Sequence, residues 1–511
     1  MSATRLLLVA AVAALSPACI IGDPFTSDDN SSDPTAAPSG PTGEPTTAGT
    51  TTDDPLPTTT DGPLPTTGGP TTDSSESGQA DEGTTADTVD IAEQLASIAG
   101  LTFEEQPTPV PGYRFFVMSF DQPADHADPD GPQFAQRLTL LHRDTDAPLV
   151  LVTAGYFINA SDPGLAEPAA LLLANQLSIE HRFFVPSRPE PADWATLTIT
   201  QAASDHHRVA QAFKAIYEGA FVATGVSKGG MASVYFRRFF PDDVDATIAY
   251  VAPQSYGDAD PRYLDFVAKL GSEACRDALH EAQRELLLRR PAMTMFMQAE
   301  AQDGFTYEDH LGIDRALETA VLELPFTFWQ YGNASHCAEI PTVAATDQEW
   351  WDFINTFNAP AYWSDYQIEL YEPYFFQAAT QLGYPAYSET SVADLLLHPG
   401  VDVAATYVLP PKMPTLDPAV MPDIADWLAS EGQRMMFVYG QNDPYTAAAF
   451  ELGDATDSFR FTVPLGNHGA EILQLPASDR ETALAALQAW TGVKPQPLVL
   501  PHAPRLRLAP R

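Results

Sequence analysis

The sequence is 511 residues long and 44% hydrophobic, an ordinary share for a globular protein with a large core and more than one structural unit. It contains 68 acidic and 26 basic residues, which gives a formal net charge of −42 at pH 7. A surface this acidic repels nucleic acid and anionic lipid headgroups, which excludes partners of both classes that bind by charge.

Residues 1–19 are typical of an export signal, because Arg5 precedes the apolar residues 6–15. The four residues that end in Cys19 resemble a bacterial lipobox, although serine stands where that motif usually has leucine. Cys19 is therefore the predicted lipidation site, and a lipid anchor there is the one membrane attachment that we expect. Cleavage near Ala18 and free secretion is the alternative. No later apolar run of the sequence is long enough to span a bilayer.

Residues 20–88 consist mostly of Thr, Pro, Gly, Ser and Asp. Such a segment buries too little apolar surface to fold, so we expect a disordered linker that tethers the folded part to a membrane or envelope. Folded sequence begins near Val89. At the other end, residues 494–511 are rich in proline and are predicted to be an extension with no assigned role.

Strands alternate with helices in the first folded part, residues 89–257. This alternation predicts a doubly wound, mostly parallel sheet with helices on both faces. The predicted strands are 113–120, 134–142, 149–153, 176–182, 219–224 and 247–252, and the predicted helices are 91–98, 205–217 and 231–240.

The pattern changes over residues 258–431, which are helix-like and rich in Trp, Tyr and Phe. Sheet character resumes in residues 432–493, with strands predicted at 434–439 and 460–464. The middle segment is therefore predicted to be a large helical cap inserted into the sheet.

The pentapeptide Gly-Val-Ser-Lys-Gly at 225–229 fits the Gly-x-Ser-x-Gly pattern of a nucleophile elbow. It lies between a predicted strand and a predicted helix, which is the context that this motif requires. Ser227 is therefore the predicted nucleophile of an α/β-hydrolase fold. The expected oxyanion-hole donors are the backbone N–H of Lys228 and an N–H near Tyr156, which follows the strand at 149–153.

An acid and a base follow the nucleophile in the order that this fold uses. Asp443 comes just past the strand predicted at 434–439, and His468 just past the strand at 460–464. Catalytic groups of parallel sheets lie on such loops at strand ends. Taken singly, Asp443 also fits a turn-forming Asn-Asp-Pro and His468 a loop histidine. Together with Ser227 they predict a Ser-His-Asp set.

Cys275 and Cys337 are the two cysteines that remain beyond Cys19. An exported chain with two such cysteines favours a disulfide between them, within the inserted segment. The cysteines have no metal-ligand spacing, so neither a metal site nor a cofactor is predicted.

Several motifs together resemble the bacterial prolyl tripeptidyl and tetrapeptidyl aminopeptidases, serine peptidase family 37. The resemblance spans roughly residues 111–492, and the linker lies outside the family's pattern. It implies an α/β-hydrolase that removes short N-terminal peptides, often after Pro, from substrates with a free amino terminus. The Glu-His-Arg at 180–182 also resembles the lysosomal prolyl carboxypeptidase group. The segments that match family 37 are 122–126, 136–138, 180–183, 201–208, 225–230, 250–253, 328–331 and 335–341.

An exopeptidase of this kind needs a carboxylate for the substrate's ammonium group and a pocket for proline. Glu323 is the first candidate carboxylate, because it stands among apolar residues of the insertion, and Glu180 at a strand end is the second. An internal ion pair is the alternative for each. Trp329, with Phe328 and Tyr331, is the candidate proline pocket, and insertion core is the alternative for these aromatic residues.

The predicted function is a secreted or lipid-anchored serine exopeptidase acting through an acyl-enzyme on Ser227. An esterase or lipase on the same scaffold is one alternative, because a fold does not fix a function. An inactive surface-binding lipoprotein is another, which the complete Ser-His-Asp set disfavours. The sequence leaves the oligomeric state open.

Overall fold

The computed structural model describes residues 89–108, 110–161 and 163–496. The predictions of an export signal, of lipidation at Cys19 and of a disordered linker at 20–88 lie outside these residues, as does most of the extension at 494–511.

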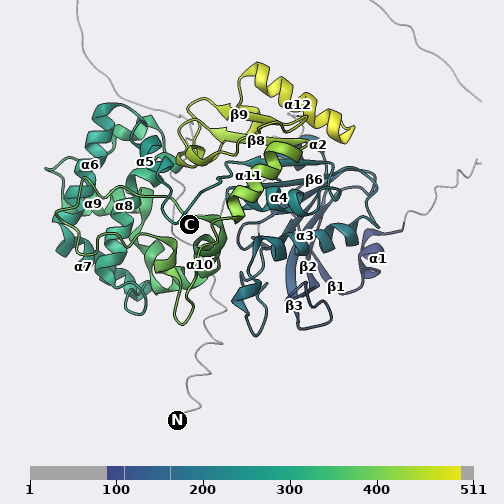
Figure 1. The fold of residues 1–511 in the computed structure, drawn as a ribbon, viewed down its shortest axis with the longest axis horizontal. Coiled ribbons are helices and arrows are strands. Elements are labelled where there is room, and N and C mark those ends of the chain that lie inside the picture. Colours follow the sequence, from purple (N-terminus) through teal and green to yellow (C-terminus); the bar gives the residue numbers. More distant parts are fainter. Residues whose placement is uncertain (1–88, 109, 162, 497–511) are drawn as a thin grey trace, which may run out of the picture. The chain divides into compact units, whose positions relative to one another are not determined.

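A nine-stranded sheet organises the described residues, in the order β1-β2-β3-β5-β4-β6-β7-β8-β9 (Figure 1). The pairs β1·β2, β2·β3 and β3·β5 are antiparallel, and every neighbouring pair from β5 to β9 is parallel. This confirms the predicted mostly parallel sheet of an α/β-hydrolase. The strands are β1 (Leu101–Gln106), β2 (Arg114–Pro123), β3 (Gln133–His142), β4 (Leu149–Thr153), β5 (Asn175–Ile179), β6 (Phe221–Val226), β7 (Ala246–Tyr250), β8 (Met435–Gly440) and β9 (Phe459–Val463).

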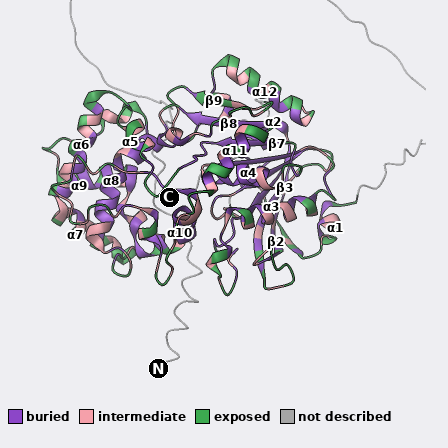
Figure 2. Cartoon of the chain, in the orientation of Figure 1, coloured by how far each residue is buried: buried purple, intermediate pink, exposed green. Residues whose placement is uncertain are grey.

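Helices cover both faces of the sheet, which explains why β4, β5, β7 and β8 are buried at every position. In β4, Val150 and Val152 pack with residues of α2 and α12, whereas Leu149 and Leu151 pack with residues of α1 and α3. Figure 2 shows these strands buried between the helices. The helices on the sheet are α1 (Ile91–Ala96), α2 (Glu167–Leu172), α3 (Ile199–Phe213), α4 (Lys228–Phe239), α11 (Val420–Glu431) and α12 (Ala477–Thr491).

Among the elements that differ from the sequence prediction, β1 and α3 do so for local reasons. Strand β1 was not predicted, because it lies at the sheet edge and only Leu101 in it is buried. Helix α3 begins six residues before the predicted start at 205. Thr198 caps it there, since its side chain accepts a hydrogen bond from the N–H of Gln201.

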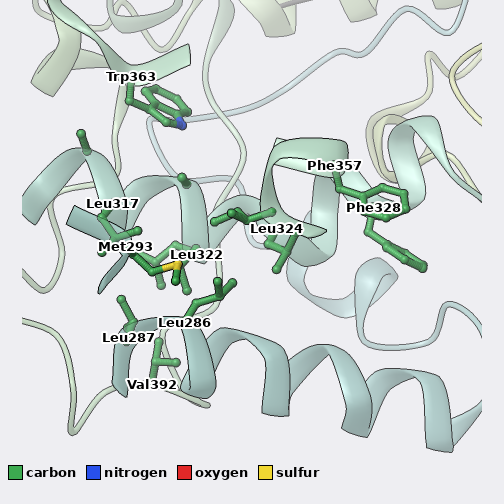
Figure 3. Packing of buried hydrophobic residues seen from close by; sticks show 14 of the residues in the cluster. Leu286, Leu287, Met293, Leu317, Leu322, Leu324, Phe328, Phe357, Trp363 and Val392 are labelled. Carbon is green, nitrogen blue, oxygen red and sulfur yellow. The ribbon is translucent and has the colours of Figure 1, made fainter. Parts of the chain in front are cut away.

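The segment between β7 and α11 forms a helical cap, defined here as residues 258–419. Its centre is α8 (Ile313–Tyr331), which is buried over most of its length. Figure 3 shows leucine, methionine and aromatic side chains of the cap packed around this helix. The other cap helices are α5 (Arg262–Val267), α6 (Glu273–Leu288), α7 (Arg290–Glu300), α9 (Asp347–Asn358) and α10 (Asp365–Gln377). None of the helices in the described residues is long and apolar enough to cross a bilayer.

Short helical turns connect these elements. They are η1 (Trp194–Thr196), η2 (Ala301–Asp303), η3 (Ala334–Ala338), η4 (Pro360–Trp363), η5 (Ala378–Leu382), η6 (Ala404–Tyr407), η7 (Pro444–Ala448) and η8 (Ile472–Gln474).

The cap ends earlier than the sequence pattern indicates. The predicted insertion runs to residue 431 and therefore includes α11. In the structure α11 packs against the sheet, where Ile424 and Leu428 share a hydrophobic cluster with Val234 of α4 and Phe437 of β8. The helix belongs to the α/β core because its apolar face covers β8. Helical periodicity alone does not distinguish a cap helix from one that covers a sheet.

A disulfide joins Cys275 of α6 to Cys337 of η3, the pair that the sequence predicts. The two cysteines are 62 residues apart in the sequence, so the bond closes a long loop around α7 and α8. Both lie in or against the hydrophobic cluster of the cap.

Removing this disulfide is expected to destabilise the cap without moving Ser227, Asp443 or His468, which lie outside the loop that it closes. By the chain-entropy estimate a loop of this length stabilises the folded state by about 4 kcal/mol. The double variant Cys275→Ala/Cys337→Ala should therefore unfold at a lower urea concentration than the wild-type protein. An unchanged urea midpoint, or two alkylatable thiols in the unreduced native protein, would contradict the prediction.

Candidate active site

The turn between β6 and α4 holds Ser227 in a strained backbone conformation, with φ 57° and ψ −125°. Glycines on both sides make this turn possible. A Cβ at Gly225 would collide with the backbone of Gly229, and a Cβ at Gly229 would lie 2.5 Å from the carbonyl oxygen of Thr153. The strand, the turn and the helix therefore present the serine at the carboxyl end of the sheet, as expected for a nucleophile elbow.

A buried aspartate follows β8 and a buried histidine follows β9. Nδ1 of His468 is 2.7 Å from Oδ2 of Asp443, which leaves Nε2 as the ring nitrogen available to a substrate site. The other carboxylate oxygen accepts the N–H of Tyr445 at 3.1 Å. The backbone N–H of His468 donates to the carbonyl oxygen of Gln330 in α8 at 2.9 Å. The carboxylate and the cap thus both fix the position of the imidazole.

Ser227 and His468 line one pocket of about 90 Å³ beneath the cap. Most of its wall is aromatic, and among the described residues His468 is the only ionisable side chain in it besides the tyrosines. The core contributes Tyr156, Ser227 and His468, and the cap contributes Gln330, Tyr331, Asn358, Tyr362, Trp363, Gln367, Tyr371, Tyr374, Phe375 and Tyr384.

The first turn of α4 brings backbone N–H groups to the same place. Lys228 is the first residue of this helix, so its N–H points toward the end at which Ser227 stands. The loop after β4 packs against this turn, since a Cβ at Gly155 would lie 2.6 Å from the nitrogen of Gly229. The next residue of the loop, Tyr156, lines the pocket. A hydroxyl, an imidazole, a carboxylate and two candidate oxyanion donors therefore converge, an arrangement able to perform acyl transfer.

The comparison with known proteins identifies the family. The family model for PS-10 peptidase S37 matches residues 84–505. A curated relative, the prolyl tri/tetrapeptidyl aminopeptidase of Streptomyces mobaraensis, is 42% identical over 418 residues, which cover 81% of this chain and 87% of the relative. The chain belongs to the PS-10 peptidase S37 family. The resemblance drawn from the motifs is thereby confirmed, and the chain is a serine peptidase.

Two solved structures that match this S37 peptidase in a structural comparison have low sequence identity to it. VinJ has a TM-score of 0.36 and 12% identity, and the match covers 76% of this chain and 99% of that one. A proline iminopeptidase of Mycobacterium smegmatis has a TM-score of 0.31 and 15% identity, with coverage of 76% and 99%.

Glu323, the first candidate carboxylate of the S37 peptidase, lies in α8 directly behind the pocket wall. It is fully buried, and its Oε1 is 3.2 Å from the hydroxyl of Tyr384, which lines the pocket. Burial raises the pKa of Tyr384 well above its usual value, and the nearby carboxylate of Glu323 raises it further. The pair therefore links the pocket surface to a buried carboxylate.

Glu180, the second candidate, lies in an internal ion pair and not in the pocket. Its Oε1 contacts the guanidinium of Arg137 and accepts the N–H of Ile158 at 3.0 Å, while its Oε2 accepts the hydroxyl of Ser187 at 2.6 Å. Its side chain is fully buried and absent from the pocket wall. The alternative that the sequence left open, an ion pair with a nearby arginine, is the observed arrangement.

Trp329 is likewise not part of the pocket around Ser227. It is 1% exposed, packs with Phe328 in the cap cluster and lines a separate cavity of the cap. Of the three aromatic residues predicted to hold proline, Tyr331 alone lines the pocket. Helix α8 is buried on nearly every side, so the sequence does not reveal which of its faces points toward the nucleophile.

Sequence reasoning missed the aromatic residues of α10 that form much of the pocket wall. Tyr371, Tyr374 and Phe375 line it, together with the polar Gln367 of the same helix. Their spacing of three and four residues places them on one face of a helix, and this periodicity was the available signal. No group of His, Cys, Asp or Glu side chains in the described part of the chain is arranged to hold a metal ion.

Proposed function

We propose that this S37 peptidase removes short peptides of two to four residues from the free amino terminus of its substrates, cutting after Pro. The name of the Streptomyces relative, a prolyl tri/tetrapeptidyl aminopeptidase, supports this substrate class. The observation that carries the proposal is the pocket itself: it contains Ser227 and His468, residues of the cap form most of its wall, and most of that wall is aromatic. Such a pocket suits the end of a peptide chain better than its middle.

We propose a Ser-His-Asp acyl-enzyme mechanism. His468 takes the proton of the Ser227 hydroxyl through Nε2 while Oγ attacks the scissile carbonyl carbon, and Asp443 stabilises the imidazolium through Nδ1. The N–H groups of Lys228 and Tyr156 hold the oxyanion. As the intermediate collapses, His468 gives its proton to the leaving amine. Water, deprotonated by the same imidazole, then releases the short peptide from the serine.

Buried polar atoms in the pocket support a peptide as the ligand. Oε1 of Gln330, Oε1 of Gln367 and Nε1 of Trp363 are buried and have no hydrogen-bond partner among the described residues. All three side chains line the pocket. Buried polar groups are otherwise almost always paired, so a ligand with both donors and acceptors would satisfy them. A peptide backbone offers both, and the tyrosine and tryptophan rings offer flat surfaces to a proline ring.

Profiling a peptide library with free and acetylated amino termini, beside simple acyl esters, tests this proposal. Rapid cleavage of free peptides after Pro supports it. Equal cleavage of free and acetylated peptides would show an enzyme without exopeptidase preference. Turnover confined to acyl esters would favour the esterase alternative. Failure to react with a phosphonate that labels active-site serines would favour the alternative of an inactive surface-binding lipoprotein.

Binding of the substrate's ammonium group is expected to depend on the carboxylate of Glu323. A charge-assisted hydrogen bond in a partly desolvated site contributes roughly 1.5–3 kcal/mol, which corresponds to about 10- to 100-fold in kcat/KM. Glu323→Gln should therefore lower kcat/KM for free peptides by about that factor, while the slow cleavage of acetylated peptides barely changes. The measurement is the ratio of the two kcat/KM values.

Glu318→Gln provides a matched control for this prediction. Glu318 is a second buried glutamate of α8, but its carboxylate pairs with Arg290 and accepts the N–H groups of Leu397 and His398, away from the pocket. Its removal should lower stability and leave the ratio unchanged. If Glu323→Gln lowers the cleavage of both substrates equally, Glu323 is a structural residue.

We also propose that the enzyme is exported and carries a lipid at Cys19, with free secretion as the alternative. The signal-like residues 1–19 and the linker composition of 20–88 support this. Fractionation of producing cells, with mass spectrometry of the mature amino terminus, separates lipidated, secreted and retained forms.

A further inference from the structure

The side chain of Lys228 is buried beneath the loop that follows β4. It is 3% exposed, and its Nζ donates to the carbonyl oxygen of Gly155 at 2.6 Å. The rings of Tyr156 and Phe184 lie over the ammonium, with centroids 5.5 and 5.6 Å away. A lysine in the first turn after a nucleophile could reach solvent, yet this one turns inward.

The surroundings of this ammonium hold no counter-charge. No ion pair involving Lys228 occurs within residues 89–108, 110–161 and 163–496. The groups that share its small cavity include His181, His206 and Tyr235. Burial lowers the pKa of Lys228 well below its usual value, and the histidine pKa values are lowered by burial and, less strongly, by Lys228. Burying an ammonium group without a counter-charge costs free energy, and here one carbonyl group and two aromatic rings offset part of that cost.

That carbonyl belongs to the peptide bond that carries the N–H of Tyr156. The bond from Gly155 to Tyr156 is trans, so its C=O and N–H point in opposite directions. The C=O points toward Nζ on the buried side of the loop. The N–H therefore points to the other side, where Tyr156 and Ser227 line the pocket.

We infer that Lys228 is a positioning residue for both halves of the oxyanion hole. Its backbone N–H is one donor, and its Nζ fixes the Gly155–Tyr156 peptide so that the N–H of Tyr156 is the second. The inference rests on the proposed acyl-enzyme mechanism. It assigns to the side chain a role distinct from that of a catalytic cation, because Nζ lies on the far side of the peptide from the reacting atoms.

The close packing of the loop supports this role. Gly155 lies so near the elbow that a Cβ there would be 2.7 Å from the Cβ of Lys228. The loop therefore has little space to move toward α4. The Gly155–Tyr156 peptide group can still rotate about the bonds on either side of it. The hydrogen bond from Nζ of Lys228 opposes this rotation.

The experiment uses Lys228→Met, which keeps a long apolar stem and removes the donor. A peptidyl trifluoromethyl ketone with a free amino terminus forms a hemiketal with a nucleophilic serine, and ¹⁹F NMR reports the pKa of its hydroxyl. Without the fixed donor, this pKa is expected to rise by about one unit, because one pKa unit corresponds to a tenfold loss of oxyanion stabilisation. We expect kcat to fall by about 10- to 100-fold with KM nearly unchanged.

Met231→Leu is the matched control, since Met231 is buried in the first turn of α4 and is absent from the pocket wall. It should leave the hemiketal pKa at the wild-type value. If Lys228→Met does not fold, Lys228→Leu replaces it, because leucine is smaller than lysine and its side chain likewise has no hydrogen-bond donor.

The outcomes separate the inference from the proposed mechanism. A wild-type enzyme that forms no hemiketal overturns the nucleophile assignment and the inference with it. A wild-type hemiketal with an unchanged pKa in the variant overturns the inference alone, even where kcat falls, since lost stability would then explain the fall. A raised pKa in the Lys228 variant and not in Met231→Leu supports the inference.

Discussion

Replacing Ser227 with alanine is expected to lower kcat by about 10⁴-fold or more while the protein stays folded. The serine lies on a turn whose shape is set by the glycines at 225 and 229, and its Oγ serves as no cap for α4. Losing the hydroxyl therefore removes the nucleophile and little packing. The measurement is kcat on a proline-containing peptide with a free amino terminus, together with the thermal midpoint.

Ser233→Ala provides the control for this experiment. Ser233 is a buried serine on the same helix, and its hydroxyl donates to the carbonyl of Gly230 at 2.7 Å, outside the pocket. Its loss should cost roughly 1 kcal/mol of stability and leave kcat near the wild-type value. A Ser227→Ala preparation, free of wild-type enzyme, that retained more than a tenth of wild-type kcat would end the nucleophile assignment.

The sheet and the positions of Ser227, Asp443 and His468 at strand ends were predictable because both depend on local patterns. Strands buried on two faces are apolar without interruption, as in β4 and β8, and such runs are readable in one sequence. The elbow requires glycines at fixed spacing around Ser227. Asp443 and His468 then follow from chain order and from their place after two strands.

The substrate side of the site was harder to predict because it depends on how the cap packs. Trp329 and Tyr331 are two residues apart on α8, yet the first packs in the cap and the second lines the pocket. Both are large and aromatic, so composition does not separate them. Glu180 and Glu323 present the same difficulty for carboxylates, since their partners Arg137 and Tyr384 lie 43 and 61 residues away.

The position of Lys228 shows a further limit of sequence reasoning. Its motif predicts that the backbone N–H faces the oxyanion, but a lysine side chain there has several possible directions. The partner of its Nζ, Gly155, is 73 residues earlier in the chain. Only the parallel pairing of β4 with β6 brings the two loops together at one edge of the sheet.

Replacing Asp443 with asparagine is expected to lower kcat by about 10⁴-fold, nearly as much as removing the serine. Asparagine has the shape of aspartate, and its oxygen can still accept the N–H of Tyr445. Its amide, however, donates toward Nδ1 of His468 where the carboxylate accepts. The imidazole then carries its proton on Nε2 and cannot take the proton of Ser227. The measurement is kcat at a fixed pH, with folding followed by circular dichroism.

A second aspartate–histidine pair, in which the aspartate is buried and the histidine is partly exposed, offers a matched control. Asp243 accepts from His207, with Oδ2 2.6 Å from Nδ1, and neither residue lines the pocket. Asp243→Asn should therefore leave kcat within about twofold of wild type, because groups that do not touch the reaction contribute through stability alone. The double variant Ser227→Ala/Asp443→Asn should be no slower than Ser227→Ala, since residues of one catalytic unit are not additive. Losses that multiply in the double variant would mean that Asp443 acts independently of the serine, contrary to the proposed mechanism.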